Sequence, residues 1–570
     1  MIRRAPMRAA LRWVAIAAAL AATVTAFEGV AGSRTSAAPA PAESAPNAPR
    51  TLVRWRPWSA SAFEDARRSR RLVLLHLTTS WSRSAHEMDR DTWTDSTVAA
   101  IVQAGFIPLR VDADRRPDIA DRYLSTGYPT TAILDADGQV LVSGAVIAAA
   151  PLRRMLEEIR TTVRDNRAEI ARRSAESAMA VAKTWERDDK PPSTTPFEKW
   201  LDLNLDAVRQ AEDKKYGGFG TAPKLPQFES IGFLHAAAAY RDDQALRTIA
   251  LRATDGSMRL QDSTWGGFFR FARDEDWKRP RTEKLLGVNA DAISTLARAY
   301  AVSAEPRYRA AARQAEAYAA RWLWDDRRGG YYASQDADAG GSSGSGKLGA
   351  ADQSLSGDVF YGLSDRARRR RRAPAVDSIF TADGNARFAS AIFAGARARM
   401  WEGATVHRAI RALDRLWAEQ RAPDGSLFHV WERGVASVPG ILADQAAAGI
   451  AYLDAYETTG DARHLERARA LARYMRQRLE DRGGGGFRYA PRDSSAIGRL
   501  RAGEKPEVGN IEAATFFLRL WEKERRAEDL ESATRAFDWL RSGEVVALDP
   551  ARAELGIRLA TLRARHDLPH

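Results

Sequence analysis

The sequence predicts a two-domain protein in which a small α/β domain precedes a larger all-α domain, a toroid of paired helices. Two observations carry this prediction. Strand-like and helix-like segments alternate over residues 51–165, and a Gly-Gly-aromatic pattern then recurs over residues 196–570. The chain has 570 residues and no cysteine, so both domains must be stabilised by their hydrophobic cores without disulfides.

The N-terminus has the composition of an export signal. Arginines precede an apolar run over residues 13–27, and small residues suited to cleavage follow. We expect residues 1–32 to be a signal peptide or an uncleaved membrane anchor, although the run is short for the roughly 20 residues of a spanning helix. Residues 33–50, rich in Ala, Pro and Ser, should form a disordered tether. The protein is therefore expected to be exported: periplasmic, secreted or anchored by this segment.

The net charge of +13 does not indicate nucleic-acid binding. Most arginines alternate with Asp and Glu along helices, as on solvated faces. An Arg-rich run at 366–372 follows a Gly/Ser-rich stretch at 339–349, and we expect a disordered surface loop there; contact with anionic lipid or glycan is the functional alternative. No aromatic residue is interleaved in that run, so base stacking is unsupported. No nucleic-acid partner is expected, and membrane contact only through an uncleaved N-terminus.

Residues 51–165 read as a domain with a buried sheet. The segment 72–77 is a continuous apolar run of the parallel-strand type. Expected strands cover residues 72–77, 106–111, 131–134 and 139–143, and expected helices cover 63–69, a stretch containing 84–88 and 98–103, 118–124, and a segment after Pro151. This β-α-β-α-β-β-α order is that of thioredoxin. Residues 166–195 are expected to form a helical linker.

Short motifs in this domain resemble the thioredoxin-like domain of the spermatogenesis-associated thioredoxin-domain family. Members typically read Cys-His-Trp-Cys-His, and the cysteine positions fall here on Ser82 and Ala85, followed by His86. Residues 111–118 resemble the V-D-R-E-E-R-P-D of the family, and Pro129 falls where thioredoxins keep a cis-proline beside the dithiol. Because thiol–disulfide exchange needs a thiolate, we expect that the fold is kept and the redox chemistry is lost.

Ser82 could replace a cysteine as nucleophile only with a positioned base. His86, one helical turn away, is the candidate base, but no carboxylate that would orient it is evident. Capping of the helix by Ser82 is therefore the favoured interpretation. One histidine supplies too few ligands for a metal site, and we expect neither a metal nor another cofactor in this protein.

Residues 196–570 read as repeated helical hairpins. Paired amphipathic helices lie between turns rich in glycine, and the helices at 197–212 and 550–563 are left single at the two ends. Those two could pair and close the ring, which predicts six hairpins and an (α/α)6 toroid. The turns that mark the repeat are residues 216–219, 265–268, 328–331, 423–428 and 484–487.

The same family places such a toroid, similar to glycoside hydrolases and N-acylglucosamine epimerases, after its thioredoxin-like domain. Residues 217–226 resemble its G-G-F-G-G-A-P-K-F-P motif, and residues 280–290 resemble P-H-F-E-K-M-L followed by N-A. The histidines of the family after Gly267 and Pro280 are replaced by Phe269 and Arg281, which disfavours epimerase chemistry.

Loops on one face of such a toroid form its mouth, so polar residues near them are site candidates. The catalytic candidates are Glu283, Asp336 and Asp444, because glycoside hydrolysis needs two carboxyl groups about 5–9.5 Å apart. Structural alternatives remain open for each: an ion pair for Glu283, a turn for Asp336 and a helix-dipole contact for Asp444. The ligand-binding candidates are Lys224, Lys284, Asn289, Asp338 and Asn510.

Two functional hypotheses follow. The favoured one is an exported binding or scaffold protein whose toroid holds a carbohydrate-like ligand or a protein partner, next to a redox-inactive thioredoxin-like domain. The alternative is a carbohydrate-active, glycosidase-like enzyme that uses Glu283 with Asp336 or Asp444. Placing these carboxylates in one open cleft would favour the enzyme, whereas separate, hydrogen-bonded positions would favour binding.

Overall fold

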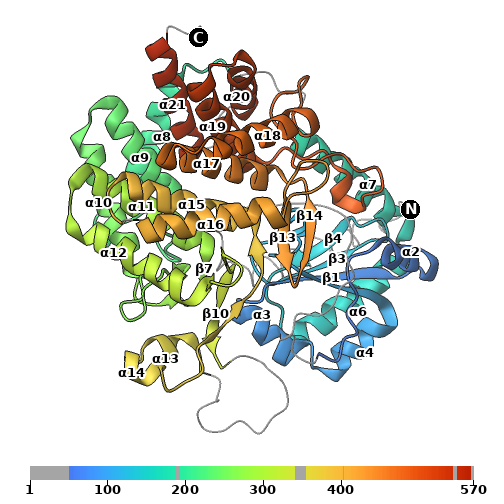
Figure 1. The fold of residues 1–570 in the computed structure, drawn as a ribbon. Coiled ribbons are helices and arrows are strands. Elements are labelled where there is room, and N and C mark those ends of the chain that lie inside the picture. Colours follow the sequence, from blue (N-terminus) through green and yellow to red (C-terminus); the bar gives the residue numbers. More distant parts are fainter. Residues whose placement is uncertain (1–50, 187–192, 341–354, 402, 543–548, 567–570) are drawn as a thin grey trace.

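The computed structural model describes residues 51–186, 193–340, 355–401, 403–542 and 549–566 (Figure 1). The expected export segment and tether lie outside these ranges. In the described part of the chain, no helix combines the length and apolar content that crossing a membrane requires.

The first domain has the thioredoxin-like fold predicted from the sequence. Strand β1 (Leu72–Thr78) runs parallel to β2 (Phe106–Asp112) and antiparallel to β3 (Thr130–Leu134), which pairs with β4 (Val140–Gly144), so the order is β2-β1-β3-β4. The helices of this part are α2 (Ala60–Ser69), α3 (Arg83–Glu87), α4 (Ser96–Gly105), α5 (Pro117–Tyr123), α6 (Ala149–Asp165) and α7 (Arg167–Glu186), with a π-helical turn η1 (Met88–Thr92) after α3.

The sheet is covered on both faces because β1 alternates between two cores. Leu75 packs in one cluster with Phe63 of α2, and Leu74 packs in another with Val102 of α4. This explains the continuous apolar run in the sequence, since both faces of the strand are buried.

The second domain closes into an (α/α)6 toroid, as predicted. Each inner helix contacts the next, and the last contacts the first; each also packs against one outer helix. The inner helices are α9 (Phe228–Arg241), α11 (Leu286–Ser303), α15 (Ala382–Arg397), α17 (Leu442–Thr459), α19 (Glu507–Glu524) and α21 (Pro550–His566). Their outer partners are α10 (Gln244–Ser257), α12 (Pro306–Tyr318), α16 (Gly403–Glu419), α18 (Ala462–Arg478), α20 (Ala527–Leu540) and α8 (Phe197–Ala211). The pair of α8 with α21 is the closure expected from the two single helices.

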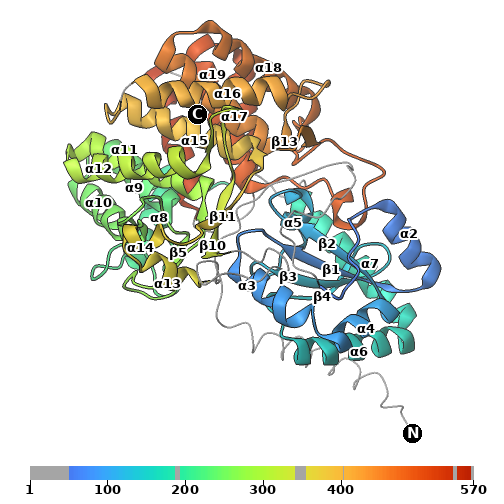
Figure 2. The same cartoon turned by 60° about the horizontal axis from the view of Figure 1, so that its bottom comes forward.

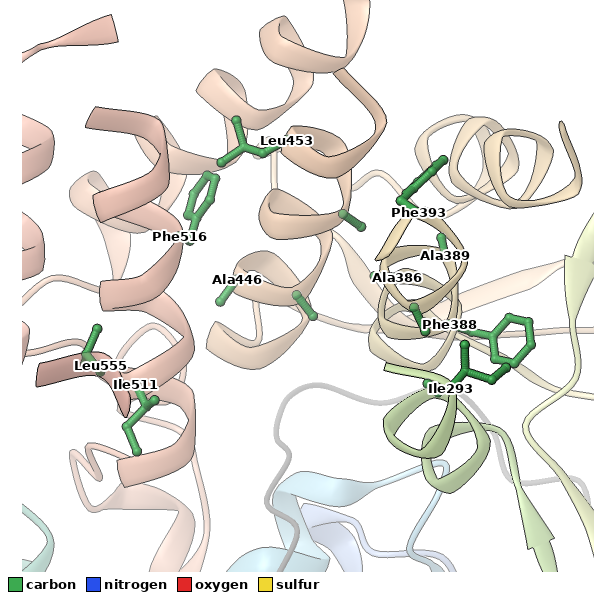
Figure 3. Close-up of a cluster of buried hydrophobic side chains, with 14 of the residues drawn as sticks. Ile293, Ala386, Phe388, Ala389, Phe393, Ala446, Leu453, Ile511, Phe516 and Leu555 are labelled. Atoms are coloured by element: carbon green, nitrogen blue, oxygen red, sulfur yellow. The ribbon is translucent and has the colours of Figure 1, made fainter. Parts of the chain in front are cut away.

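One continuous core holds this ring together. Figure 3 shows part of it, with side chains of successive inner helices facing one another: Ile293 of α11 near Phe388 of α15, and Leu453 of α17 near Phe516 of α19. Glycine allows a close approach here, because a Cβ at Gly449 of α17 would lie 2.6 Å from the ring of Phe516. The core is therefore shared by neighbouring hairpins, which individually could not bury their apolar faces.

Short strands and turns on one side of the toroid face the thioredoxin-like domain (Figure 2). The three-stranded sheets are β11-β10-β7 and β12-β13-β14. These elements and the remaining short ones are β5 (Phe271–Ala272), β6 (Pro280–Arg281), β7 (Lys284–Leu285), β8 (Trp324–Asp325), β9 (Gly330–Tyr331), β10 (Ser334–Ala339), β11 (Pro374–Asp377), β12 (Phe380–Thr381), β13 (Phe428–Glu432), β14 (Val435–Pro439), α13 (Gly357–Tyr361), α14 (Asp365–Arg368), η2 (Met258–Leu260), η3 (Ala319–Leu323) and η5 (Gly498–Arg501).

The Arg-rich run differs in part from the expected disordered loop. It begins in the short helix α14, and Arg368 is buried, with its guanidinium 2.7 Å from Asp262 Oδ2. Arg366 and residues 369–372 are exposed, as expected of a surface segment. Burial of Arg368 is stabilised by this ion pair, which the sequence pattern did not indicate because its partner lies 106 residues away.

Candidate functional site at the domain junction

The segment at the former dithiol position is buried at the junction of the two domains. Ser82 precedes α3, and its Oγ accepts a hydrogen bond from the backbone N–H of Ala85, so Ser82 acts as a helix cap. The exposed fraction is 4% for Ser82 and 0% for Ala85. The peptide bond before Pro129 is cis, in keeping with its thioredoxin-like position.

Contacts to strand β10 and its surroundings cover this segment. The Nε of Arg83 donates to Asp338 Oδ1 at 2.9 Å, and its Nη1 donates to Asp358 Oδ2 at 3.1 Å. The His86 Nδ1 lies 3.6 Å from Asp336 Oδ1, and the backbone N–H of Ala337 donates to the Trp81 carbonyl. The face that would meet a substrate disulfide in a redox-active thioredoxin is therefore occupied by the toroid.

Glu283 and Asp336 lie together at this junction in different electrostatic environments. Burial raises the pKa of Asp336 to about 6; the nearby His86 opposes this shift, and the charges of Asp338 and Glu283 reinforce it. Glu283 is 2% exposed, and its Oε1 pairs with Arg270 Nη2 at 2.9 Å. The pKa of one carboxyl group is thus raised by burial, and the other carboxyl group pairs with a guanidinium, so the two groups lie in different environments.

Asp444 lies in a separate cluster with His429 and Asp383. The Nδ1 of His429 is 3.0 Å from Asp444 Oδ1 and 3.7 Å from Asp383 Oδ1. The backbone N–H of Asp383 donates to Asp444 Oδ1 at 3.1 Å. One nitrogen or carboxylate oxygen from each of the three side chains lies within 4.8 Å of the others, so these side chains could hold a metal ion. His429 was not among the site candidates, since its contacts join distant segments.

A further acidic group crosses the junction around Arg115. Its guanidinium donates to both carboxylate oxygens of Asp377 and of Glu432, at 2.9–3.0 Å, and lies 3.2 Å from Asp112 Oδ2. Burial, together with the charges of Asp112 and Asp377, raises the pKa of Asp114 to about 7. These residues lie in the family-like motif at 111–118, but the motif alone did not indicate their partners across the junction.

The lysine candidates make structural contacts within the repeated turns. Lys284 Nζ donates to Asp262 Oδ2 at 2.8 Å and to the Gly266 carbonyl at 2.7 Å, and burial lowers its pKa to about 8. Lys224 pairs in the same way with Asp213 and the Gly220 carbonyl. Both lysines are fully buried, so their role in ligand binding stays a prediction while their role in the turns is direct.

Each of the two amide candidates binds the backbone of the aromatic residue in one repeated turn. Asn510 Oδ1 accepts from the Phe487 backbone N–H, and its Nδ2 donates to the carbonyls of Phe487 and Pro506. Asn289 Oδ1 likewise accepts from the Phe268 backbone N–H at 2.8 Å. Each amide is thus satisfied by backbone groups of its own repeat, so its observed role is structural.

A small cavity lies between the domains, away from these carboxylates. Its volume is about 220 Å³, and its lining includes Trp58 and Arg122 from the first domain and Tyr489 and Glu504 from the second. A second cavity, of about 580 Å³, lies beside α8 and α10 and includes Ala245. Neither of these two cavities is lined by Glu283, Asp336 or Asp444.

The fold and the junction define a class of protein in which a thioredoxin-like domain without cysteines is seated on an (α/α)6 toroid. Residues 46–182 match the family described as "Protein of unknown function, DUF255". The curated relatives include Spermatogenesis-associated protein 20 from Homo sapiens, 26% identical over 314 residues, and from Rattus norvegicus, 24% identical over 314 residues. These matches confirm the resemblance to the spermatogenesis-associated thioredoxin-domain family.

The matched part covers 50% of this chain and 39% of either curated relative, so the chain spans about two fifths of their length. Similar solved structures include cellobiose 2-epimerase from Bacillus thermoamylovorans, with a TM-score of 0.49 and 14% identity over 64% of this chain and 98% of that one. A GH76 alpha-mannanase from Bacteroides thetaiotaomicron has a TM-score of 0.46 and 10% identity over 65% of this chain and 97% of that one.

Proposed function

We propose that this protein is an exported binding protein without thiol–disulfide exchange activity, and that it binds a small carbohydrate-like ligand in the cavity between its domains. A protein partner is the other form of the same proposal. The thioredoxin-like domain acts as a fixed cap on the toroid. The observation that carries the proposal is the contact of the segment from Trp81 to His86 with β10, in which Trp81, Ser82 and Ala85 are buried.

Charged contacts support the role of a fixed cap. Arg83 reaches from α3 to Asp338, and Arg115 reaches from the loop before α5 to Asp377 and Glu432. These side chains are less than one third exposed. Breaking such a shielded pair leaves an uncompensated charge, which costs several kcal/mol. The domains are therefore expected to stay together during function.

The composition of the 220 Å³ cavity supports a small, polar ligand. Trp58 and Tyr489 supply aromatic surface, and Arg122, Asp118 and Glu504 supply charged groups. Aromatic rings beside convergent polar groups are the usual means by which a pocket orients a small molecule. The volume lies below the roughly 300–1,000 Å³ typical of drug-sized pockets, which suits a ligand of about one sugar ring.

A cavity-filling pair of variants tests this proposal. Ala496 lines the junction cavity, and Ala245 lines the separate cavity beside α10. We expect Ala496→Trp to abolish binding on a glycan array and in calorimetry with monosaccharides, and Ala245→Trp to leave binding unchanged. Equal binding by Ala496→Trp would contradict the assigned cavity. Absence of binding to every glycan would contradict the carbohydrate form and leave the protein-partner form.

One observation favours the glycosidase-like alternative. Asp336, with its pKa raised to about 6, resembles a general acid, and Glu283 pairs with Arg270 nearby. Both groups are buried beneath the thioredoxin-like domain, so the alternative requires the cap to open. Hydrolysis of aryl glycosides that both Asp336→Asn and Glu283→Gln abolish would favour this enzyme over a binding protein.

A further inference from the structure

Three buried side chains at the mouth of the toroid form a compact group that the proposed function does not use. Asp383 lies in the first turn of α15, Asp444 lies in the first turn of α17, and His429 lies on β13. Their exposed fractions are 7%, 0% and 3%. The group thus combines two carboxylates and an imidazole in a site that is shielded from solvent.

The hydrogen bonding of His429 requires either a proton or a metal ion at its Nδ1 atom. The Nε2 atom lies 3.2 Å from the backbone carbonyl of Asp114, so Nε2 carries a proton. The Nδ1 atom lies 3.0 and 3.2 Å from the two carboxylate oxygens of Asp444. In a neutral imidazole protonated at Nε2, Nδ1 has a lone pair, and a lone pair facing carboxylates is repelled unless a proton or a metal ion lies between them.

We infer that His429, Asp383 and Asp444 bind one divalent transition-metal ion of the Zn²⁺ or Mn²⁺ class through His429 Nδ1 and a carboxylate oxygen of each aspartate. Two ligand atoms at 2.0–2.2 Å from a tetrahedral zinc ion lie roughly 3.4 Å apart. The distances from Nδ1 to Asp444 Oδ1 and Asp383 Oδ1, 3.0 and 3.7 Å, bracket this value. Imidazole with carboxylates suits these ions better than Ca²⁺ or Cu⁺.

Groups outside the ligand set hold it in place. The ring of His429 is oriented by its hydrogen bond to the Asp114 carbonyl, which is the usual outer partner of a metal-binding histidine. The Asp444 carboxylate is oriented by the backbone N–H of Asp383. Two carboxylates also neutralise the charge of a divalent ion, and three protein ligands leave a further coordination position for water or a ligand.

This inference departs from the sequence-based expectation that the protein needs no metal. His429 and Asp444 are 15 residues apart, and Asp383 contributes from a different hairpin. These three residues therefore form no compact sequence motif, and packing of α15 against α17 brings the ligands together. The inference is independent of the proposed carbohydrate site, because none of the three residues lines the junction cavity.

Metal binding by the full chain tests the inference. After removal of metals with a chelator, we expect calorimetry and elemental analysis to show one equivalent of bound Zn²⁺. Asp444→Asn should weaken Zn²⁺ binding at least about 100-fold, since even outer partners contribute 10–100-fold. Asp336→Asn is the matched control: Asp336 is also buried beside a histidine but outside the group, and its loss should leave Zn²⁺ affinity unchanged.

Three outcomes would overturn the inference. The first is that the wild-type chain binds neither Zn²⁺ nor Mn²⁺ at millimolar concentration, in which case a proton lies on His429 Nδ1. The second is that Asp444→Asn binds Zn²⁺ with unchanged affinity. The third is that the bound ion lies away from these three residues. If Asp444→Asn does not fold, anomalous diffraction at the zinc edge from wild-type crystals decides. A peak about 2.0–2.2 Å from His429 Nδ1 supports the inference, and its absence contradicts it.

Discussion

At the scale of a single residue, the buried carboxyl group of Asp336 lowers the stability of the folded protein at neutral pH. Burial raises its pKa to about 6 in the folded protein, above the value near 3.8 of an exposed aspartate. Between these two values the folded state binds more protons than the unfolded state, so stability decreases as the pH rises through this window. The full destabilisation is present above the folded pKa and is absent below the unfolded one.

We expect Asp336→Asn to remove this dependence. The substitution should stabilise the protein at pH 7.5 by about 2–3 kcal/mol, an order-of-magnitude conversion of the shift, and by about 0 kcal/mol near pH 4. Denaturant unfolding at the two pH values measures the difference. Asp326, whose pKa is lowered by hydrogen bonds from Trp324 and Arg411, is the control, because Asp326→Asn should give no gain at pH 7.5. An equal effect of Asp336→Asn at both pH values would contradict the assignment.

At the scale of the structural element, the repeated turn is the unit that fixes each inner helix. An aspartate four residues before the Gly-Gly pair anchors the turn: Asp262 Oδ1 accepts from the Thr264 backbone N–H, and the Gly266 N–H donates to the Asp262 carbonyl. Gly267 has a φ of +74°, and a Cβ there would lie 2.5 Å from Tyr318. The turn, its aspartate and the Asn289 amide therefore together hold Phe268 against the following inner helix.

We expect Asn510→Ala to destabilise the toroid by about 3 kcal/mol or more. The substitution removes three hydrogen bonds and leaves the Phe487 N–H and carbonyl without their amide partner, at about 1–3 kcal/mol for each unsatisfied group; the Pro506 carbonyl keeps its bond from the Asn510 backbone N–H. Thr515→Ala, on the same helix, is the control and should cost less, since Thr515 Oγ1 donates only to the Ile511 carbonyl of its own helix. Urea unfolding measures both effects; equal costs would exclude a clamp.

The same turns show what could be predicted from sequence. Glycine pairs and helical periodicity are local signals, so the hairpins and the closing pair of α8 and α21 were predicted from them. The clamping role of Asn510 was missed, because its partner Phe487 lies 23 residues away and the pairing depends on the finished turn. The cluster of His429 with Asp444 and the contacts of Trp81 and Arg83 with β10 depend on packing between hairpins or domains, for which the sequence has no local signal.

At the scale of the whole molecule, the chain has no cysteine, so a single introduced thiol can report how tightly the two domains are held together. Ser82, at the former dithiol position, is 4% exposed beneath the toroid. A thiol placed there can react with a reagent only when the junction opens. Its reaction rate relative to an exposed thiol therefore reports the free energy of opening.

We expect the Ser82→Cys thiol to react with a chromogenic disulfide reagent at least about 100-fold more slowly than the thiol of Ser494→Cys, which lies at an exposed position. This ratio corresponds to an opening free energy of about 3 kcal/mol. Both thiols should react equally fast in denaturant. Adding Arg115→Ala removes the pairs with Asp377 and Glu432, and the Ser82→Cys thiol should then react faster. Comparable rates for the two single thiols in the native protein would show that the thioredoxin-like domain is not held against the toroid, and the proposed cap would be wrong.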